Sequence, residues 1–397
     1  MRLGIDCTAI DPNYKGGVNT FTFGLLKGLL GIHSVGVEYI IFCSSTNEHL
    51  FTDYLANDKC KIVVVKKHAF FKKIFLILPF LFNSLKLWEL SMNLFSRIFK
   101  IKNTIEESCD LLYVPTTVLN VYNLSIPTFL SMHDIQQYHY PEFFTKNELK
   151  HRRLTFENSA KNASYFQASS HFIKDDILHH FNWLREDQVV VISEGVDIDK
   201  FSNICDRSVI KKFQLPEQFL FFPAQLWKHK NHITVLKALR KIEIQSGISI
   251  PLVMTGAKYS GSNDVLDFVK NNDINYVYYL GKVEFPELLA LYKEARYLVS
   301  AALYESSSLP ILEAAAAGLP IIASKTPPNI EMSKDIEMNF FEPLGVTQCA
   351  ETIKCCWLGD ENSMKDQAVN NSKAVRSYSW NAIAEQYQQF MIDKLEC

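Results

Sequence analysis

Short apolar runs alternate with helical stretches along this chain, and few folds accommodate that alternation. The first series of runs comprises Leu3–Cys7, Tyr39–Cys43, Ile62–Val65, Leu111–Val114 and Thr128–Met132. The second series comprises Phe219–Phe222, Leu252–Thr255, Val277–Leu280, Tyr297–Ala301 and Ile321–Ala323. Runs that are apolar throughout are typical of parallel strands whose two faces are both covered by helices. The sequence therefore predicts an α/β protein with two parallel sheets.

A more polar stretch, Ser193–Gln214, separates the two series and contains the turn signal Glu194-Gly195. Composition shifts of this kind are typical of domain boundaries. A chain of 397 residues is also long enough for two domains that each bury a core. We therefore predict one domain over residues 1–195 and a second over residues 196–377.

The charge and cysteine content excludes several classes of protein. The chain has 41 Lys and Arg against 43 Asp and Glu, a net charge of -2, whereas nucleic-acid-binding proteins usually have a basic excess. The nine cysteines show no CxxC spacing, which argues against a disulfide framework or zinc site and favours a reducing compartment. Asp6 argues against a signal peptide. We expect a cytoplasmic protein that does not bind nucleic acid.

Residues 66–102 interrupt the alternation. Apolar residues recur there at steps of three and four, which predicts helices broken near Pro79. The stripe consists of Ile74, Leu78, Leu81, Leu85, Trp88, Met92, Phe95 and Phe99. The longest apolar run in this segment is too short to span a membrane. The segment has eight Lys or Arg residues and one acidic residue, Glu89, which gives a local charge of +7. It is interpreted either as core helices with a basic outer face or as an interfacial element on the inner face of the cytoplasmic membrane.

Two features follow strands of the first series. Gly16-Gly17 precedes a helical run, Asn19–Leu30, so its backbone can approach a phosphate at a helix N-terminus, although a simple turn fits the doublet equally well. His133 lies at the carboxyl end of a predicted strand, where open α/β sheets place their ligands. Both are candidate site residues of the first domain.

The sequence gives no pattern of clustered metal ligands such as HExxH, so we predict no metal site. The pairs His179-His180 and His229/His232 are interpreted as surface or core residues. Asp197-Ile198-Asp199 imitates the metal-binding acid pair of some sugar transferases, but it lies in the stretch between the domains and is set aside.

The segment Glu305–Glu313, ESSSLPILE, directly follows the predicted strand Tyr297–Ala301 and opens the predicted helix Pro310–Ala317. A strand, a loop of small residues and a helix N-terminus form an anion-binding arrangement. Glu313 is placed to accept hydrogen bonds from ribose hydroxyls, as acidic residues do in dinucleotide-binding folds. The competing interpretation is a helix-cap charge and a surface carboxylate.

Lys230 lies in the segment Pro223–His232, PAQLWKHKNH, at the end of the first strand of the second series. Asn231 is a candidate cap for the helix that follows. A lysine at this place can neutralise a pyrophosphate leaving group. Taken alone, a lysine near a helix start is an ordinary surface residue.

As an ordered set these residues resemble glycosyltransferase family 4, whose members are retaining, metal-independent enzymes. The resemblance rests on Gly16-Gly17, His133-Asp134, the segment EGVDIDKF from Glu194 to Phe201, Lys230, Gly281-Lys282-Val283 and the spacing of Glu305 and Glu313. It covers nearly the whole chain. It implies two facing Rossmann-like domains of the GT-B fold with a cleft between them, and a final helix, 378–397, that crosses back to the first domain.

The resemblance also implies the role of each site residue. A nucleotide-sugar donor would bind the second domain, with Glu313 on the ribose, Lys230 on the diphosphate, the backbone near Val283 against the base and Glu305 on the transferred sugar. His133 and the Gly16-Gly17 loop would approach from the first domain, and His133, Glu305 and Lys230 would be catalytic. The remaining donor contacts would come from Gln225, Ser306, Ser307, Ser308 and Leu309. No cofactor is implied.

Two departures from the family pattern concern the donor site. Gln225 stands where most members have an arginine, so one cationic side chain that would contact the donor's phosphates is missing. In this respect the sequence resembles a bacterial branch of the family. Ser306–Ser308 stand where the common family motif EGFGLP has its glycines. Serine does not adopt the positive φ angles that glycine adopts readily.

The reaction that the residues favour is transfer to a glycan or lipid-linked saccharide by front-face displacement, since no carboxylate is clearly placed as a nucleophile. Two alternatives stay open. One is a nucleotide-sugar epimerase of the same fold, and the other is a catalytically lapsed relative that binds a nucleotide sugar or a partner at the membrane.

Overall fold

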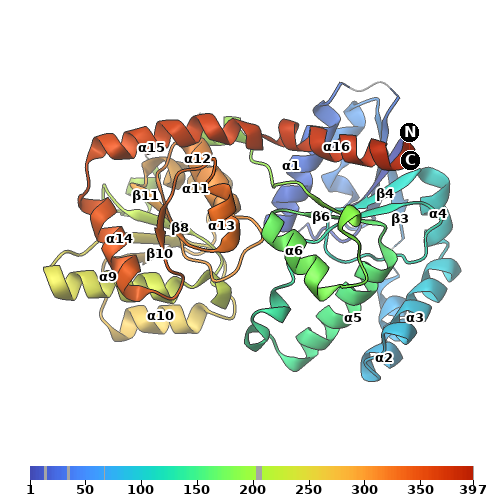
Figure 1. Ribbon diagram of the computed structural model, residues 1–397, viewed down its shortest axis with the longest axis horizontal. Coiled ribbons are helices and arrows are strands. Elements are labelled where there is room, and N and C mark those ends of the chain that lie inside the picture. The colour runs from blue at the N-terminus through green and yellow to red at the C-terminus, as the bar shows by residue number, and fades with distance from the viewer. Residues whose placement is uncertain (13–15, 34–35, 67, 203–207, 397) are drawn as a thin grey trace. The chain divides into compact units, whose positions relative to one another are not determined.

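The structure is a computed structural model that describes residues 1–12, 16–33, 36–66, 68–202 and 208–396. The chain divides into two compact units (Figure 1). The N-terminal unit comprises Met1–Gly195 and Trp380–Cys397, and the C-terminal unit comprises Val196–Ser379. Each unit contains its own parallel sheet. The prediction of two parallel-sheet α/β domains is therefore confirmed.

The N-terminal sheet has the strand order β3-β2-β1-β4-β5-β6-β7, and its neighbouring strands are parallel. The strands are β1 (Arg2–Asp6), β2 (Glu38–Ser44), β3 (Cys60–Val65), β4 (Leu111–Val114), β5 (Thr128–Ser131), β6 (Tyr165–Ala168) and β7 (Val189–Val191). The helices are α1 (Gly17–Gly31), α2 (Ala69–Leu81), α3 (Leu85–Ile98), α4 (Ile101–Ser108), α5 (Lys146–Asn162), α6 (His171–His180) and α16 (Trp380–Glu396). The five predicted strands of this series agree with β1 to β5, whereas β6 and β7 were not predicted.

The C-terminal sheet has the strand order β10-β9-β8-β11-β12-β13 and is also parallel. Its strands are β8 (Leu220–Pro223), β9 (Leu252–Thr255), β10 (Val277–Tyr279), β11 (Tyr297–Ser300), β12 (Ile321–Ser324) and β13 (Asn339–Phe341). Its helices are α7 (Ile198–Ser202), α8 (Ser208–Lys212), α9 (His232–Ser246), α10 (Ser262–Asn271), α11 (Phe285–Glu294), α12 (Leu309–Ala317), α13 (Pro327–Met332), α14 (Val346–Leu358) and α15 (Glu361–Ala374). The predicted strands agree with β8 to β12, and β13 was not predicted.

Successive side chains of the central strands enter two separate cores in the C-terminal unit. Phe221 and Leu298 belong to a core that includes residues of α11 and α12. Their neighbours Phe222 and Val299 belong to a second core that includes residues of α9 and α14. Because side chains alternate across a strand, a sheet covered on both faces needs apolar residues at every position. This explains the uninterrupted apolar runs in the sequence.

Helix α16 packs against α1 in the N-terminal unit through glycines of α1. A Cβ added at Gly24 would lie 2.0 Å from the Trp380 ring, and one added at Gly28 would lie 2.4 Å from the Trp380 carbonyl oxygen. The ring of Phe21 also meets Trp380 edge-on, with centroids 5.7 Å apart. The final segment of the chain is therefore part of the core of the N-terminal unit.

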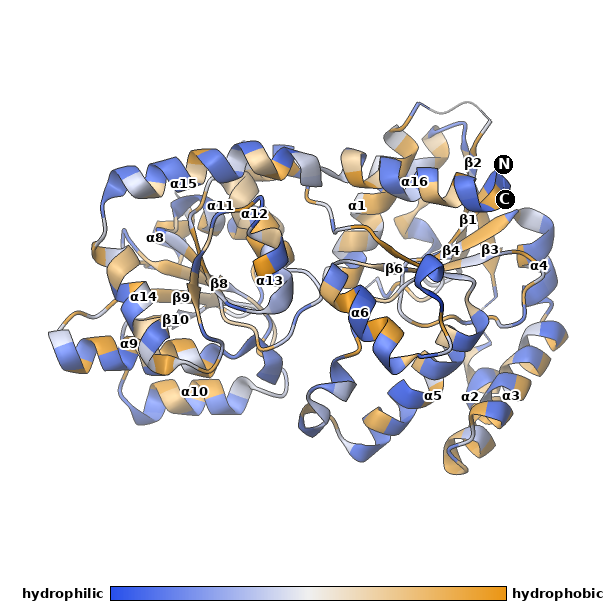
Figure 2. Ribbon diagram, viewed as in Figure 1, coloured by the Kyte–Doolittle hydropathy of each residue, from blue (hydrophilic) through white to orange (hydrophobic). Residues whose placement is uncertain are grey.

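Residues 66–102 form α2, α3 and the beginning of α4, and the predicted apolar stripe is divided between two environments. Of its α3 members, Trp88, Met92 and Phe95 are buried and Leu85 is half-buried. Its α2 members are exposed: Ile74, Leu78 and Leu81. The interpretation as core helices is therefore right for this face of α3 and wrong for α2. Both helices carry hydrophobic residues (Figure 2). Lys67 lies outside the described residues, and none of the described helices has both the length and the apolar character that crossing a membrane requires.

Candidate functional site

Lys230 and Glu305 form an ion pair at the carboxyl end of the C-terminal sheet. Strands β8 and β11 are paired neighbours, so the loops that follow them emerge side by side. The Leu303 amide donates to the His229 carbonyl at 2.8 Å, which joins the two loops. Lys230 Nζ lies 2.5 Å from Glu305 Oε1, and the Glu305 side chain is 4% exposed. The fold thus brings together two of the three residues predicted to be catalytic.

Three polar atoms of the Glu305 loop are buried without a hydrogen-bond partner. They are Glu305 Oε2, Ser307 Oγ and Ser308 Oγ. Buried polar atoms are nearly always hydrogen-bonded in folded proteins, so their clustering here indicates a place where a ligand supplies the partners. Ser308 is the N-cap residue of α12, and its hydroxyl makes no cap hydrogen bond. The helix N-terminus carries partial positive charge, which favours an anionic group beside Leu309.

Asn231 holds the Lys230 loop in place through contacts with other loops, whereas the sequence predicted that its side chain caps α9. It is the N-cap residue of α9, with a left-handed φ of 56°, but its side chain makes no cap hydrogen bond. Its Nδ2 instead donates to the carbonyls of Ala301 at 3.0 Å and Pro343 at 2.7 Å. Thr234 Oγ1 donates to its Oδ1. Asn231 therefore ties the loop after β8 to the loops after β11 and β13, a role that local sequence does not reveal.

Glu313 lies inside α12, on the same loop-to-helix segment as Glu305. Its carboxylate accepts a hydrogen bond from the hydroxyl of Tyr292, a buried residue of α11 that sequence reasoning missed. Burial raises the pKa of Glu313 to about 7, and the hydrogen bond from Tyr292 opposes this shift. The carboxyl group of Glu313 therefore titrates close to neutral pH. Nothing in a lone tyrosine within an amphipathic helix distinguishes it from an ordinary core residue.

Gln225 follows β8 and is hydrogen-bonded to one member of a stacked aromatic pair. Its Oε1 accepts a hydrogen bond from Trp227 Nε1 at 2.9 Å. The Trp227 ring stacks on Tyr259, with centroids 3.8 Å apart and planes 13° apart. Trp227 and Tyr259 come from the loops after β8 and β9, and a backbone bridge between Leu226 and Lys258 holds these loops together. The amide side chain at position 225 is thus fixed by an aromatic neighbour that the sequence analysis did not single out.

Val283 follows β10 and packs against one of the two cores of the C-terminal unit. The turn before it contains Gly281 with φ of +69°, a conformation that suits glycine. The Gly281 carbonyl accepts a hydrogen bond from the Gly256 amide at 2.8 Å. This contact aligns the loops after β9 and β10 at the carboxyl end of the sheet. The predicted base-contacting backbone is therefore at the same sheet edge as Lys230.

His133 follows β5 at the carboxyl end of the N-terminal sheet. The Phe21 ring meets it edge-on, with centroids 4.8 Å apart, and the residue is 9% exposed. Its Nε2 lies 2.8 Å from the Pro115 carbonyl, which can only accept, so Nε2 carries the hydrogen. Burial lowers the pKa of His133 and favours the neutral ring, which leaves a lone pair on Nδ1. Nδ1 lies 4.0 Å from Glu194 Oε1.

Gly16 and Gly17 lie at the start of α1 in the same unit. Gly16 is the N-cap residue in an extended conformation, and its carbonyl accepts the amides of Asn19 and Thr20. Gly17 is the first residue of the helix. The doublet therefore occupies a helix N-terminus, the arrangement in which a phosphate can approach backbone amides. Residues 13–15, directly before it, lie outside the described residues.

The remaining sequence candidates have structural partners. Asp197 pairs with Lys200 at 2.9 Å. His232 is buried against Phe222, with ring centroids 4.0 Å apart, and burial lowers its pKa to about 3. Across the described part of the chain, no group of three or more His, Cys, Asp or Glu side chains is arranged to hold a metal ion.

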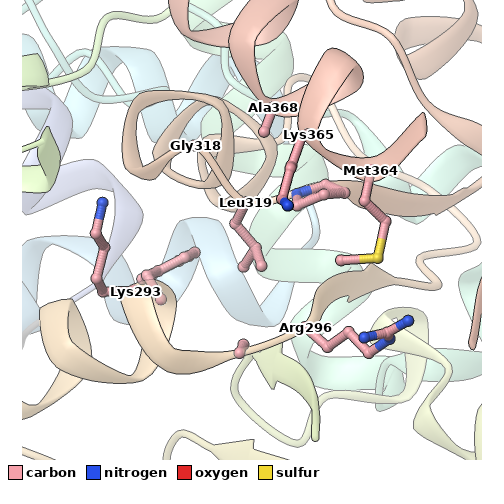
Figure 3. A pocket seen from close by; sticks show the side chains of 10 residues that line it. Lys293, Arg296, Gly318, Leu319, Met364, Lys365 and Ala368 are labelled. Atoms are coloured by element: carbon pink, nitrogen blue, oxygen red, sulfur yellow. The ribbon is translucent and has the colours of Figure 1, made fainter. Parts of the chain in front are cut away.

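A cavity of about 160 Å³ in the C-terminal unit lies at the C-terminal end of α12, and Tyr292 is part of its lining (Figure 3). Its lining includes Arg296, Gly318, Leu319 and Met364. Gly318 is the C-cap of α12, whereas Ser308 and the unpaired polar atoms are at the opposite end of that helix. None of the predicted site residues lines this cavity, so it is not the candidate site.

Family models match both halves of the chain. The model for "Glycosyltransferase Family 4" matches residues 15–200, and the model for "Glycosyl transferases group 1" matches residues 206–393. The chain belongs to glycosyltransferase family 4. The resemblance seen in the sequence is thereby confirmed.

Curated relatives of this family 4 member include two O-antigen enzymes. The O-antigen chain mannosyltransferase B of Escherichia coli is 27% identical over 200 residues, which are 49% of this chain and 52% of that protein. The O-antigen chain mannosyltransferase RfbU of Salmonella typhimurium is 26% identical over 198 residues, 50% of this chain and 52% of that protein. The matches thus span about half the length of these curated relatives.

Solved structures show the fold over the whole chain. HepE of Anabaena in complex with UDP and glucose has a TM-score of 0.70 at 17% identity, covering 99% of this chain and 100% of that one. WaaG, a glycosyltransferase involved in lipopolysaccharide biosynthesis, has a TM-score of 0.67 at 12% identity, covering 97% and 98%. At these identities the likeness concerns the fold alone, and it is the GT-B fold.

Proposed function

We propose that this chain is a retaining glycosyltransferase that moves a sugar from a nucleotide-diphosphate sugar to a glycan or lipid-linked saccharide. The observation that carries the proposal is the Lys230–Glu305 pair, placed beside buried polar atoms that lack partners at the N-terminus of α12. Supporting this proposal, HepE is a protein whose complexes contain UDP and glucose, and two relatives are named O-antigen mannosyltransferases.

In the proposed mechanism the departing diphosphate is stabilised by preorganised charge. Lys230 and the start of α12 are oriented before the donor arrives, so they lose little energy in reorganisation during the reaction. The free Oε2 of Glu305 accepts a hydroxyl of the transferred sugar, while its Oε1 keeps the lysine in position. The leaving phosphate itself takes the proton of the acceptor hydroxyl. No side chain is required as a nucleophile, and the anomeric configuration is retained.

Further residues are proposed to contact the donor. Glu313 holds the ribose, and the backbone near Val283 lies against the base. The other proposed donor contacts are Gly16, Gly17, Gln225, Ser306, Ser307, Ser308 and Leu309. His133 is proposed to accept a sugar hydroxyl at Nδ1, because its neutral ring keeps the lone pair there.

We expect turnover to be insensitive to EDTA, because Lys230 and the N-terminus of α12 are proposed to neutralise the departing diphosphate in place of a divalent cation. Donor consumption is measured with and without excess EDTA, and EDTA saturated with calcium serves as the control for non-specific effects. Loss of activity in EDTA that magnesium or manganese restores would contradict the proposed mechanism.

We also propose that the reaction takes place at the cytoplasmic face of a membrane, where a lipid-linked acceptor is held. The basis is the local charge of residues 66–102, eight Lys or Arg against one Glu. Each basic residue close to an anionic lipid surface contributes about 1 kcal/mol before screening by salt.

A further inference from the structure

Exposed large hydrophobic side chains are concentrated on the hairpin of α2 and α3. Of the 22 large hydrophobic side chains that are exposed among the described residues, half lie between positions 70 and 98. Those on α2 and its end are Phe70, Phe71, Ile74, Ile77, Leu78, Leu81 and Phe82, and those on α3 are Leu87, Leu90, Leu94 and Ile98. We call these eleven residues the α2–α3 ridge. A concentration of large exposed apolar side chains on one element marks an interaction site.

Helix α3 has two apolar faces, and the second one has no partner within the described chain. Trp88, Met92 and Phe95 form the face that is buried. The ridge residues of α3 follow one another at steps of three and four, so they form a separate face of the same helix. Leu90 is 56% exposed and Leu94 is 54% exposed. One apolar face is sufficient to pack α3 against the rest of the unit. The second apolar face therefore points to contact with another apolar environment.

The turn of the hairpin is hydrogen-bonded to α5. Lys150 and Arg153 of α5 donate to the carbonyls of Leu81 at 3.1 Å and Asn83 at 2.8 Å, at the turn between α2 and α3. The ring of Phe75 meets Phe95 edge-on between the two helices, with centroids 5.7 Å apart. The exposed side chains at the turn, Leu81 and Phe82, thus lie on a segment that α5 and the contact between α2 and α3 hold in place.

The charged residues beside the ridge indicate what kind of partner covers it. Four exposed basic side chains lie on or beside the two helices: Lys73, Lys86, Arg97 and Lys100. The sole acidic residue between positions 66 and 102 is Glu89, which accepts a hydrogen bond from Asn123. Apolar residues on a helix face flanked by lysine and arginine are typical of helices that lie in a lipid interface.

We propose that the α2–α3 ridge inserts among the lipids of an anionic membrane, with the surrounding lysines and arginine at the level of the head groups. The inference deepens the proposed membrane location, and it does not depend on the proposed reaction. A second copy of the chain is a poorer occupant, because a twofold contact would bring the same basic rim against itself. Insertion also predicts a component of binding that salt does not remove, unlike attraction between charges alone.

The test compares two variants of the full chain that each replace four exposed side chains with serine. The ridge variant carries Leu78→Ser, Leu81→Ser, Leu90→Ser and Leu94→Ser. The control variant carries Leu55→Ser, Ile244→Ser, Leu344→Ser and Leu358→Ser, at residues that are 53–74% exposed elsewhere. Co-sedimentation is measured with vesicles of phosphatidylethanolamine and phosphatidylglycerol and with vesicles of phosphatidylcholine, at low salt and at about 1 M salt.

We expect the wild type to bind the anionic vesicles and to retain part of this binding at high salt. The ridge variant should partition at least about tenfold less at both salt concentrations, because it loses apolar area that would leave water. The control variant should bind like the wild type, and hydrolysis of a water-soluble donor should be the same in all three proteins. Failure of the proposed reaction would instead appear as absent donor hydrolysis in the wild type.

Depth of insertion is measured with tryptophan reporters at two exposed sites, Phe82→Trp and Ile244→Trp. Brominated lipids should quench the added fluorescence of Phe82→Trp and leave that of Ile244→Trp unchanged. Equal binding of ridge variant and wild type, absence of wild-type binding, or equal quenching at both sites overturns the proposal. A wild-type dimer that the ridge variant converts to a monomer, without any change in vesicle binding, also overturns it.

Discussion

Replacing Lys230 with methionine is expected to lower kcat by roughly 100-fold or more, the size of effect seen when one preorganised donor to a developing charge is lost. Methionine keeps the length of the side chain and removes its charge. Lys228→Met is the matched control, because Lys228 is an exposed neighbour in the same 3₁₀ helix. Steady-state kinetics with the donor at saturation measure the effect. Equal kcat values for the two variants would contradict the proposed role of Lys230.

The same substitution leaves the Glu305 carboxylate without its cation, so stability must be separated from chemistry. Removing one partner of a buried ion pair costs about 3–5 kcal/mol, and the Glu305 side chain is 4% exposed. The double variant Lys230→Met/Glu305→Gln removes both charges and should recover most of the lost stability. It should remain inactive. Recovery of activity together with stability would show that the pair is merely structural.

Glu313→Gln is expected to raise the KM for the donor by roughly 10- to 100-fold, because hydrogen bonds to a charged acceptor contribute about 1.5–3 kcal/mol. The effect on kcat should be small, in contrast to that of Lys230→Met. The wild-type KM should also fall as the pH rises from 6 to 8, because the pKa of Glu313 is about 7 and the carboxylate is the better acceptor for ribose hydroxyls. In Glu313→Gln this pH dependence should disappear.

Tyr292→Phe provides a test of the same assignment that leaves the carboxyl group in place. The hydroxyl of Tyr292 donates to Glu313 and lowers its pKa, in opposition to burial. Its removal should therefore move the midpoint of the KM profile to higher pH. A KM that is independent of pH in the wild type, or an unchanged midpoint in Tyr292→Phe, would mean that Glu313 does not bind the donor.

The strands that the sequence predicts are those that are apolar at every position. Phe221 and Phe222 enter opposite cores, so both must be apolar, and such runs stand out. Two of the strands that were missed, β6 and β13, lack this signal. β6 (YFQA) contains Gln167, whose Nε2 donates to the Ile192 carbonyl, and β13 (NFF) begins with Asn339. β7 (VVV) is apolar throughout and was missed although it carries the signal. A strand that contains a polar residue with a specific partner is not identified from apolar runs.

The sequence predicted those site residues that directly follow a predicted strand. Lys230 and Glu305 both follow strands, but their contact joins residues 75 positions apart and depends on the pairing of β8 with β11. Asn231 and Tyr292 were not predicted as site residues, because their partners come from other loops and helices. The second apolar face of α3 was visible as Leu87, Leu90, Leu94 and Ile98, but a periodic pattern does not say which of two stripes is buried.

We propose that this chain transfers a sugar from a nucleotide-diphosphate donor through the site at the start of α12. To test this, the protein is incubated, in EDTA, with a panel of radiolabelled nucleotide sugars, and the labelled products are identified. We expect release of the nucleoside diphosphate from at least one donor, with the sugar found on water or an acceptor, and loss of this release in Lys230→Met. Recovery of an isomerised nucleotide sugar, or binding of donors without any cleavage, would contradict it.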